Sequence, residues 1–242
     1  MESTGNNKEV LLSRGLDFQG VRYILRELLQ ILVHFTVLLV SAREFGWANA
    51  WLVLGLALLL IILQAAVLQR YNPGLINRRG KVIQKETKGF DKVFVALYIP
   101  LALLVSLVCG LDAGGYGWSA VPPAVVAAGV LLYMLSWALG LWAMAVNRHF
   151  EATVIIRDKE SHRVCSAGPY KWIRHPGYAA AVSGTVSYPL VLGSWRGLAV
   201  SMVLILLFIV RTGFEDKALL RELEGYRPYA ADTRYRLLPR VW

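Results

Sequence analysis

The chain has 242 residues, of which 56% are hydrophobic and only 17% are charged. Soluble domains carry about 25% charged residues on average. The apolar residues also gather into long blocks, which indicates a protein of the lipid bilayer and excludes a large soluble domain.

Four of these blocks are long enough to cross a hydrocarbon core, which takes about 20 residues of helix. They are Tyr23–Ser41, Trp47–Leu68, Val93–Leu111 and Val121–Val146. Two shorter blocks, Tyr178–Leu192 and Gly197–Val210, lie close together, and we interpret them as a helical hairpin. The sequence thus predicts an all-α polytopic membrane protein with six spanning helices, or five if the hairpin does not cross fully.

This pattern divides the chain into three parts. Residues 1–22 form a cytoplasmic N-terminal tail, and no cleavable signal is expected because this stretch lacks an apolar run before small residues. Residues 23–146 form the first four helices. Residues 147–242 form a catalytic region that comprises a cytoplasmic loop, the hairpin and a C-terminal helix.

The distribution of basic residues predicts the orientation. Of the 26 Lys and Arg residues, 24 lie in the N-terminal segment, in the connections Arg70–Lys92 and Arg148–Arg174, or after Val210. Basic connections face the cytoplasm. We therefore expect an integral membrane protein with both termini and both long connections on the cytoplasmic side. The basic charge does not indicate nucleic-acid binding, because no basic soluble module is present.

Cysteine and histidine do not form a metal-binding pattern. Cys109 and Cys165 fall on opposite sides of the membrane in this topology, so a disulfide is not expected. The four histidines include no close pair of ligands, so no metal site is expected.

Polar residues cluster where the chain re-enters the membrane. Gly168 and Pro169 form a turn signal, and Arg174-His175-Pro176 follows, with Pro176 suited to a first helical turn. The free backbone N–H groups of a helix start attract anions. The segment therefore predicts a polar site at the membrane surface, although His175 alone is equally compatible with capping or packing.

A second polar group ends the last apolar block. Arg211 and Glu215 are four residues apart and therefore share one helical face. A catalytic pair is one interpretation. The alternative is an arginine that extends to the membrane surface beside a surface carboxylate.

Together these pieces resemble a known family. The string Gly-Pro-Tyr-Lys-Trp-Ile-Arg-His-Pro-Gly-Tyr at 168–178 resembles the signature of the isoprenylcysteine carboxyl methyltransferase family, in its prokaryotic type. Arg211, the acidic pair Glu215-Asp216 and the terminal patterns at 225–229 and 235–239 follow in the order of that family. The resemblance covers about His149–Trp242, and it differs in having aspartate as the second acid of the pair.

The resemblance implies a membrane methyltransferase that depends on S-adenosylmethionine and binds it without a Rossmann domain. Carried over by position, the cofactor-binding residues are His162, Val164, Gly168, Pro169, Tyr170, Arg174, His175, Tyr178 and Glu215. Of these, His175 and Tyr178 would hold the methionine portion and Glu215 the amino group. The adenosine side would be lined by His162, Val164, Gly168 and Tyr170. The resemblance also implies a prokaryotic cell membrane, with the active site on its cytoplasmic side. Arg211 and Glu215 are the catalytic candidates, with Arg211 neutralising an acidic acceptor.

The resemblance also implies a lipophilic or prenylated acceptor that enters from the bilayer and is methylated on a carboxylate. A phospholipid N-methyltransferase is one alternative, and a sterol-type membrane reductase that uses NADPH is another. A transporter or scaffold is disfavoured because the polar residues cluster in the connections rather than in mid-membrane. The sequence does not indicate an oligomeric state.

Overall fold

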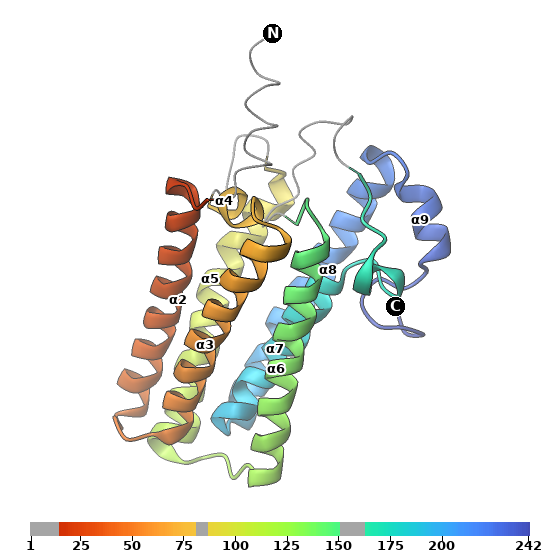
Figure 1. Ribbon diagram of the computed structural model, residues 1–242. Coiled ribbons are helices and arrows are strands. Elements are labelled where there is room, and N and C mark those ends of the chain that lie inside the picture. The colour runs from red at the N-terminus through yellow and green to blue at the C-terminus, as the bar shows by residue number, and fades with distance from the viewer. Residues whose placement is uncertain (1–14, 81–86, 151–162) are drawn as a thin grey trace.

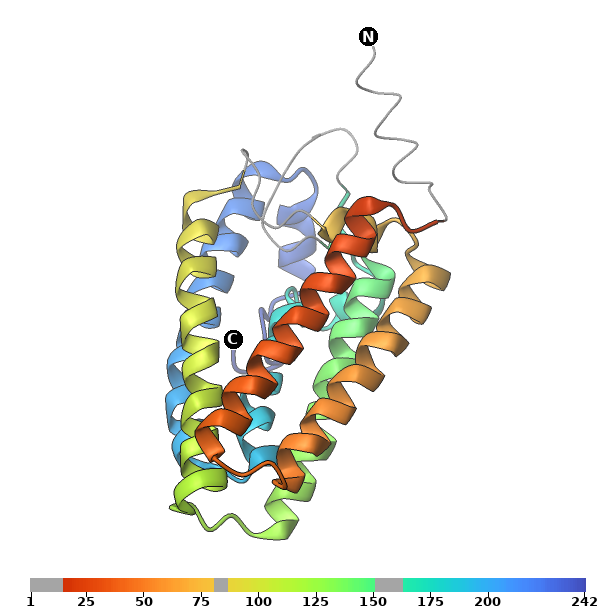
Figure 2. The same ribbon diagram turned by 90° about the vertical axis from the view of Figure 1, so that its left-hand side faces the viewer.

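The protein is a bundle of long helices in the computed structural model, which describes residues 15–80, 87–150 and 163–242 (Figures 1 and 2). All regular structure within these residues is helical. The elements are α2 (Phe18–Ala42), α3 (Ala48–Tyr71), α4 (Leu75–Arg79), α5 (Gly89–Cys109), the π-helix η1 (Gly110–Tyr116), α6 (Pro123–Val146), the 3-10 turn η2 (Gly168–Lys171), α7 (Pro176–Leu192), α8 (Trp195–Glu222) and α9 (Tyr226–Asp232).

Five helical stretches of the described chain are long and apolar enough to cross a membrane: α2, α3, α5 with η1, α6 and α8. Their outer faces carry large apolar side chains that no protein atom covers, such as Val40 at 68% and Ile62 at 66% exposure. Water would penalise so extensive an apolar surface, whereas lipid tails solvate it. The chain is therefore an integral membrane protein, as the composition predicted.

The short helix α7 also traverses the bundle. It has 17 residues and a tight turn joins it to α8. At that turn the buried carboxylate of Asp112, from η1, accepts hydrogen bonds from Ser194 Oγ at 2.6 Å and from the Arg196 backbone N–H at 3.2 Å. The hairpin tip thus reaches the connection between α5 and α6 at the far end of the bundle.

A close approach of α6 to α7 fixes the hairpin against the rest of the bundle. A Cβ atom added to Gly129 would lie 2.8 Å from Leu190 Cβ and 2.9 Å from the Val191 nitrogen. Small residues allow helix backbones to approach in this way in membranes. The hairpin is therefore packed against α6 over an interface that only a glycine permits at this point.

Several helices extend beyond the predicted apolar blocks. Helix α2 begins at Phe18, because the Asp17 side chain caps it by accepting from Gly20 N at 2.9 Å, so residues 18–22 of the expected tail are helical. Helix α5 begins at Gly89 and includes Asp91 in its first turn. Helix α8 continues well past Arg211 to Glu222. Apolar blocks mark the membrane-embedded part of a helix, not its polar ends.

One end of the bundle holds the start of α2, the helix α4, the end of α8 and the helix α9 (top in Figures 1 and 2). We call it the basic end, because α3 and α6 end there and α5 begins there, and these helix ends flank the two predicted basic connections. That this end faces the cytoplasm remains a prediction.

Candidate functional site

Two cavities adjoin each other below the basic end. The smaller, about 250 Å³, lies between the η2 turn, α7, α8 and α9, and we call it the polar cavity. The larger, about 480 Å³, lies among the membrane helices, and we call it the membrane cavity. Both are lined by Arg79, Phe150, Gly177, Ala181 and Phe208. These five residues form a junction through which a ligand in one cavity can contact a ligand in the other.

The polar cavity brings together most of the predicted site residues. Its lining includes Val164, Tyr170, Arg174, His175, Tyr178, Arg211 and Glu215. Gly168 and Pro169 are not in this lining but form the adjacent η2 turn. His162 lies outside the described residues.

The η2 turn depends on a glycine. Gly168 has φ +56°, and a Cβ there would lie 2.9 Å from Nε1 of Trp142 on α6. This turn carries Tyr170 to the cavity, where its hydroxyl accepts from Asn147 Nδ2 at 3.0 Å and its carbonyl accepts from Tyr229 Oη at 2.8 Å. Gly168 and Pro169 therefore serve to position Tyr170.

The C-terminal segment completes the start of α7. The backbone N–H groups of Arg174 and His175 donate to the carbonyls of Tyr235 and Arg236, both at 2.9 Å. Pro176 then opens α7, as its sequence position predicted. The terminal Tyr-Arg pattern and the Arg-His-Pro pattern are thus two halves of one local structure.

Asp216 organises this region and is fully buried, with 0% exposure. Its carboxylate accepts from Arg174 Nη2 at 3.0 Å, Arg236 Nε at 2.8 Å and Tyr226 Oη at 2.9 Å, and lies 3.1 Å from His175 Nε2. A buried carboxylate without partners would be very costly, and here four groups stabilise it. Asp216 is therefore a positioning residue for Arg174 and His175.

The neighbouring acid, Glu215, has a different environment. Its side chain is 18% exposed and lines the polar cavity. The Tyr178 hydroxyl donates to Oε2, while His175 Nδ1 lies 3.9 Å from Oε1. The Glu215 carboxylate therefore faces the cavity in a fixed position. The two residues beside it, Tyr178 and His175, both belong to the Arg-His-Pro-Gly-Tyr motif.

Arg211 does not extend to the membrane surface, which was the alternative to a catalytic role. Its Nε donates to Asp91 Oδ1 at 2.8 Å, and its exposure is only 7%. The guanidinium lies 4.2 Å from the Phe94 ring centroid and 5.1 Å from that of Tyr178. It is thus a buried cation on the wall of the polar cavity, with a carboxylate partner on α5.

Three phenols around the cavity remain neutral donors at physiological pH. Burial raises the pKa of Tyr170, and the same cause raises the pKa of Tyr226 and of Tyr229. The thiol of Cys165, which also lines the cavity, has its pKa raised by burial. Neither the phenols nor the thiol therefore adds a negative charge to the site at neutral pH.

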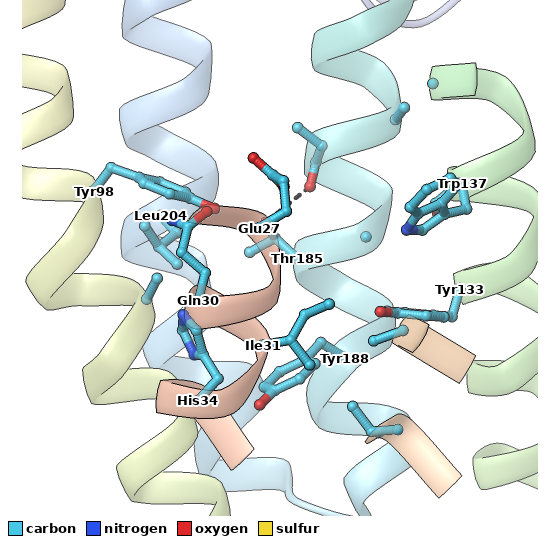
Figure 3. Close-up of a pocket in the computed structure, with 18 of the residues that line it drawn as sticks. Glu27, Gln30, Ile31, His34, Tyr98, Tyr133, Trp137, Thr185, Tyr188 and Leu204 are labelled. Atoms are coloured by element: carbon cyan, nitrogen blue, oxygen red, sulfur yellow. Dashed lines mark hydrogen bonds between the residues drawn. The ribbon is translucent and has the colours of Figure 1, made fainter. Parts of the chain in front are cut away.

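The membrane cavity is mostly apolar but has one polar wall (Figure 3). Glu27, Gln30 and His34 project from α2 toward α5 and α7. His34 Nδ1 lies 2.7 Å from Ser106 Oγ, which in turn lies 2.9 Å from Tyr188 Oη. The cavity can thus hold an apolar chain while offering hydrogen bonds along one side.

The described chain is thus a helical bundle with lipid-exposed faces, a polar cavity near one end and a mostly apolar cavity next to it among the membrane helices. Residues 128–221 match the sequence profile of the isoprenylcysteine carboxyl methyltransferase (ICMT) family. The match runs from α6 to the end of α8 and includes every predicted site residue. No curated protein matches the chain.

Sequence reasoning did not assign several residues of the site. Asp216 was noted only as a departure from the family pattern, and its partners Tyr226 and Arg236 lay in a terminal pattern without a role. Asp91 was not singled out, although a carboxylate beside an apolar block was a usable signal. Arg79 was counted only among the basic residues that predict the membrane orientation, yet its side chain lines both cavities.

Proposed function

We propose that the protein transfers the methyl group of S-adenosylmethionine to a carboxylate of a lipophilic acceptor, in the manner of isoprenylcysteine carboxyl methylation. The family match supports methyl transfer. The observation that carries the proposal is the junction of a polar and an apolar cavity, which suits a reaction between a polar cofactor and a lipid. The alternatives of phospholipid N-methylation and NADPH-dependent reduction find no such support.

The side chains of the polar cavity suit this cofactor. Glu215 offers a carboxylate for an ammonium group, and the Tyr178 hydroxyl holds that carboxylate at the cavity. When bound, S-adenosylmethionine supplies a methyl group that is activated by a positively charged sulfur. Tyr170, on the η2 turn, remains a candidate for the adenosine side.

The chain's own residues have little proton chemistry to perform. An acceptor carboxylate is already a nucleophile, so no general base is needed. Joining an anion to a methyl group that leaves a cationic sulfur cancels two charges, and exclusion of water favours such a reaction. The task of Tyr178, Arg211 and Glu215 is therefore to orient the two partners within a dry site.

The acceptor would occupy the membrane cavity with its apolar chain and present its carboxylate at the junction. Gly177 contributes to this arrangement, since a Cβ there would lie 2.6 Å from Phe150 Cζ at the boundary of the two cavities. A lipid can reach the cavity from the bilayer, while the cofactor approaches from the basic end. Two access routes avoid any need to bring a lipid into water.

The test is methylation in membranes that contain the protein, with S-adenosylmethionine carrying a radioactive methyl group. A carboxyl ester releases labelled methanol in mild base, whereas an N-methyl group does not. We expect base-labile label in a lipophilic fraction, and its absence from a Glu215→Gln sample. Base-stable label would instead support amine methylation. Stabilisation of the purified protein by NADPH, but not by S-adenosylhomocysteine, would support a reductase.

A further inference from the structure

Arg79 is the last residue of α4, between α3 and α5, and lies outside the region that matches the family. It belongs to the group of residues that line both cavities. No other charged side chain of the described chain lines both. Its position is therefore the place where the reacting end of an acceptor would meet the cofactor.

The guanidinium of Arg79 lies between two aromatic rings. Its carbon Cζ is 5.5 Å from the ring centroid of Tyr23 and 5.4 Å from that of Phe150. The atoms Nε and Nη1 are buried, and among the described residues neither has a hydrogen-bond partner. The Tyr23 hydroxyl also hydrogen-bonds to the guanidinium, so the unpartnered donors are Nε and Nη1 alone. Buried donors without partners are rare, and a bound ion or a catalytic role is one explanation for them.

Arg174 and Arg211 are buried and differ from the half-buried Arg79 in having carboxylate partners, although Arg174 Nε also has no hydrogen-bond partner among the described residues. Arg174 is paired with Asp216 and Arg211 with Asp91. The nearest carboxylate on α2, that of Glu27, lies 3.5 Å from Arg26, and Arg26 also donates to the Arg79 carbonyl at 3.1 Å. Within the described part of the chain, Arg79 thus has no ion-pair partner of its own.

We propose that Arg79 binds the carboxylate of the acceptor and thereby selects acidic lipids, an inference that rests on the proposed function. Charge-assisted hydrogen bonds from the buried Nε and Nη1 atoms would satisfy donors that have no acceptor among the described residues. The flanking rings hold the guanidinium at the junction, so that the bound carboxylate faces the polar cavity. Arg211 is less suited to this task because Asp91 already holds it.

The experiment compares an acid with its neutral analogue. Binding of N-acetyl-S-farnesylcysteine and of its carboxamide to the full-length protein is measured in the same detergent, without cofactor. We expect the wild type to prefer the acid by roughly ten- to a hundredfold, the size of a charge-assisted hydrogen bond. In Arg79→Gln we expect this preference to disappear while the affinity for the amide is unchanged.

Arg70→Gln is the matched control, because Arg70 is exposed on α3 at the same end and the substitution removes the same charge. It should keep the preference for the acid. Arg79→Lys serves as a second variant if Arg79→Gln does not fold, and it should keep the preference in part. Equal affinity of the wild type for acid and amide, including no binding of either, would overturn the inference, as would an undiminished preference in Arg79→Gln.

Two further measurements separate this inference from the proposed function. Affinity for S-adenosylhomocysteine should be unchanged in Arg79→Gln, and a loss of that affinity with an intact acid preference would assign Arg79 to the cofactor instead. Methyl transfer to the acid is then measured with the wild type. If the acid binds through Arg79 but is not methylated, the proposed function fails and the assignment of Arg79 stands.

Discussion

The Nη2 atom of Arg174 lies 3.0 Å from Oδ2 of Asp216, and both side chains are buried. This ion pair joins the start of α7 to the polar end of α8. The preceding residue, Glu215, faces the polar cavity, and its carboxylate accepts a hydrogen bond from the Tyr178 hydroxyl. Two adjacent acids thus have separate tasks, one in holding the site together and one in lining it.

Replacing Asp216 with Asn should destabilise the protein severely. The substitution leaves the Arg174 charge buried without its counter-ion, and breaking a buried pair costs about 3–5 kcal/mol. We expect a large fall in the thermal unfolding midpoint in detergent, with loss of methyl transfer as a consequence. Glu224→Gln, at an exposed position beyond the same helix, is the control and should unfold like the wild type. A normal midpoint for Asp216→Asn would show that Asp216 does not hold this region together.

Glu215→Gln should have the opposite profile, with a stable fold and weak cofactor binding. It removes the charge that we expect to face the cofactor's ammonium, and loss of a charge-assisted hydrogen bond costs about 1.5–3 kcal/mol. Calorimetric titration with S-adenosylhomocysteine should show an affinity about ten- to a hundredfold lower. Tyr178→Phe, which releases the Glu215 carboxylate without removing it, should weaken binding less. Unchanged affinity in both variants would remove Glu215 and Tyr178 from the cofactor site.

His175→Ala is also expected to weaken S-adenosylhomocysteine binding. The substitution removes a structural contact as well as a contact with the ligand. His175 lies 3.1 Å from Asp216 and is buried, so its removal also disturbs the group that Asp216 organises. We therefore expect lower affinity together with a lower unfolding midpoint. The midpoint and the affinity, measured on one preparation, separate the two contributions. An unchanged midpoint would mean that the contact with Asp216 adds little stability.

The sequence predicted the helical bundle and the residues from two motifs that line part of the polar cavity, but not how the charges pair. Apolar blocks locate membrane helices because lipid imposes a strict length and polarity. The Arg-His-Pro-Gly-Tyr string is local, so its residues were bound to lie near one another. The pairs Arg211–Asp91 and Arg174–Asp216 join distant segments, and no spacing rule connects them. Which of the two adjacent acids is buried also depends on the packing of α8 against the C-terminal segment.

Cys165 reports on the polar cavity through its reactivity. Burial raises the pKa of its thiol, so the reactive thiolate forms only at more alkaline pH than in a free cysteine. We expect alkylation by iodoacetamide to be slow at neutral pH and to accelerate as the pH rises through the alkaline range. S-adenosylhomocysteine should slow alkylation at a fixed alkaline pH, because Cys165 lines the cavity. Equal rates with and without this ligand would argue against cofactor binding there.

The orientation of the basic end is tested by cysteine labelling in intact cells. Cysteines introduced at Lys85 and Lys159, which lie outside the described residues, should resist an impermeant maleimide added from outside. The background carries Cys109→Ala and Cys165→Ser, which removes both native thiols. Tyr116→Cys is the positive control, since Tyr116 is 55% exposed at the opposite end of the bundle. Labelling of either basic-end position would reverse the predicted orientation.

The last prediction concerns Arg211, whose environment separates a catalytic cation from a structural one. Its guanidinium donates through Nε to Asp91 and lies over the rings of Phe94 and Tyr178. A lysine keeps the charge but has neither the Nε donor nor the planar group that stacks on both rings. We therefore expect Arg211→Lys to lower turnover strongly, measured in single-turnover methylation, while affinity for S-adenosylhomocysteine is retained.

Asp91→Asn removes the partner but keeps the guanidinium, and it should lower turnover less. If both substitutions impair folding equally and leave the turnover of the folded fraction unchanged, then Arg211 serves only to tie α8 to α5, and the orienting task falls to Arg79 and Glu215.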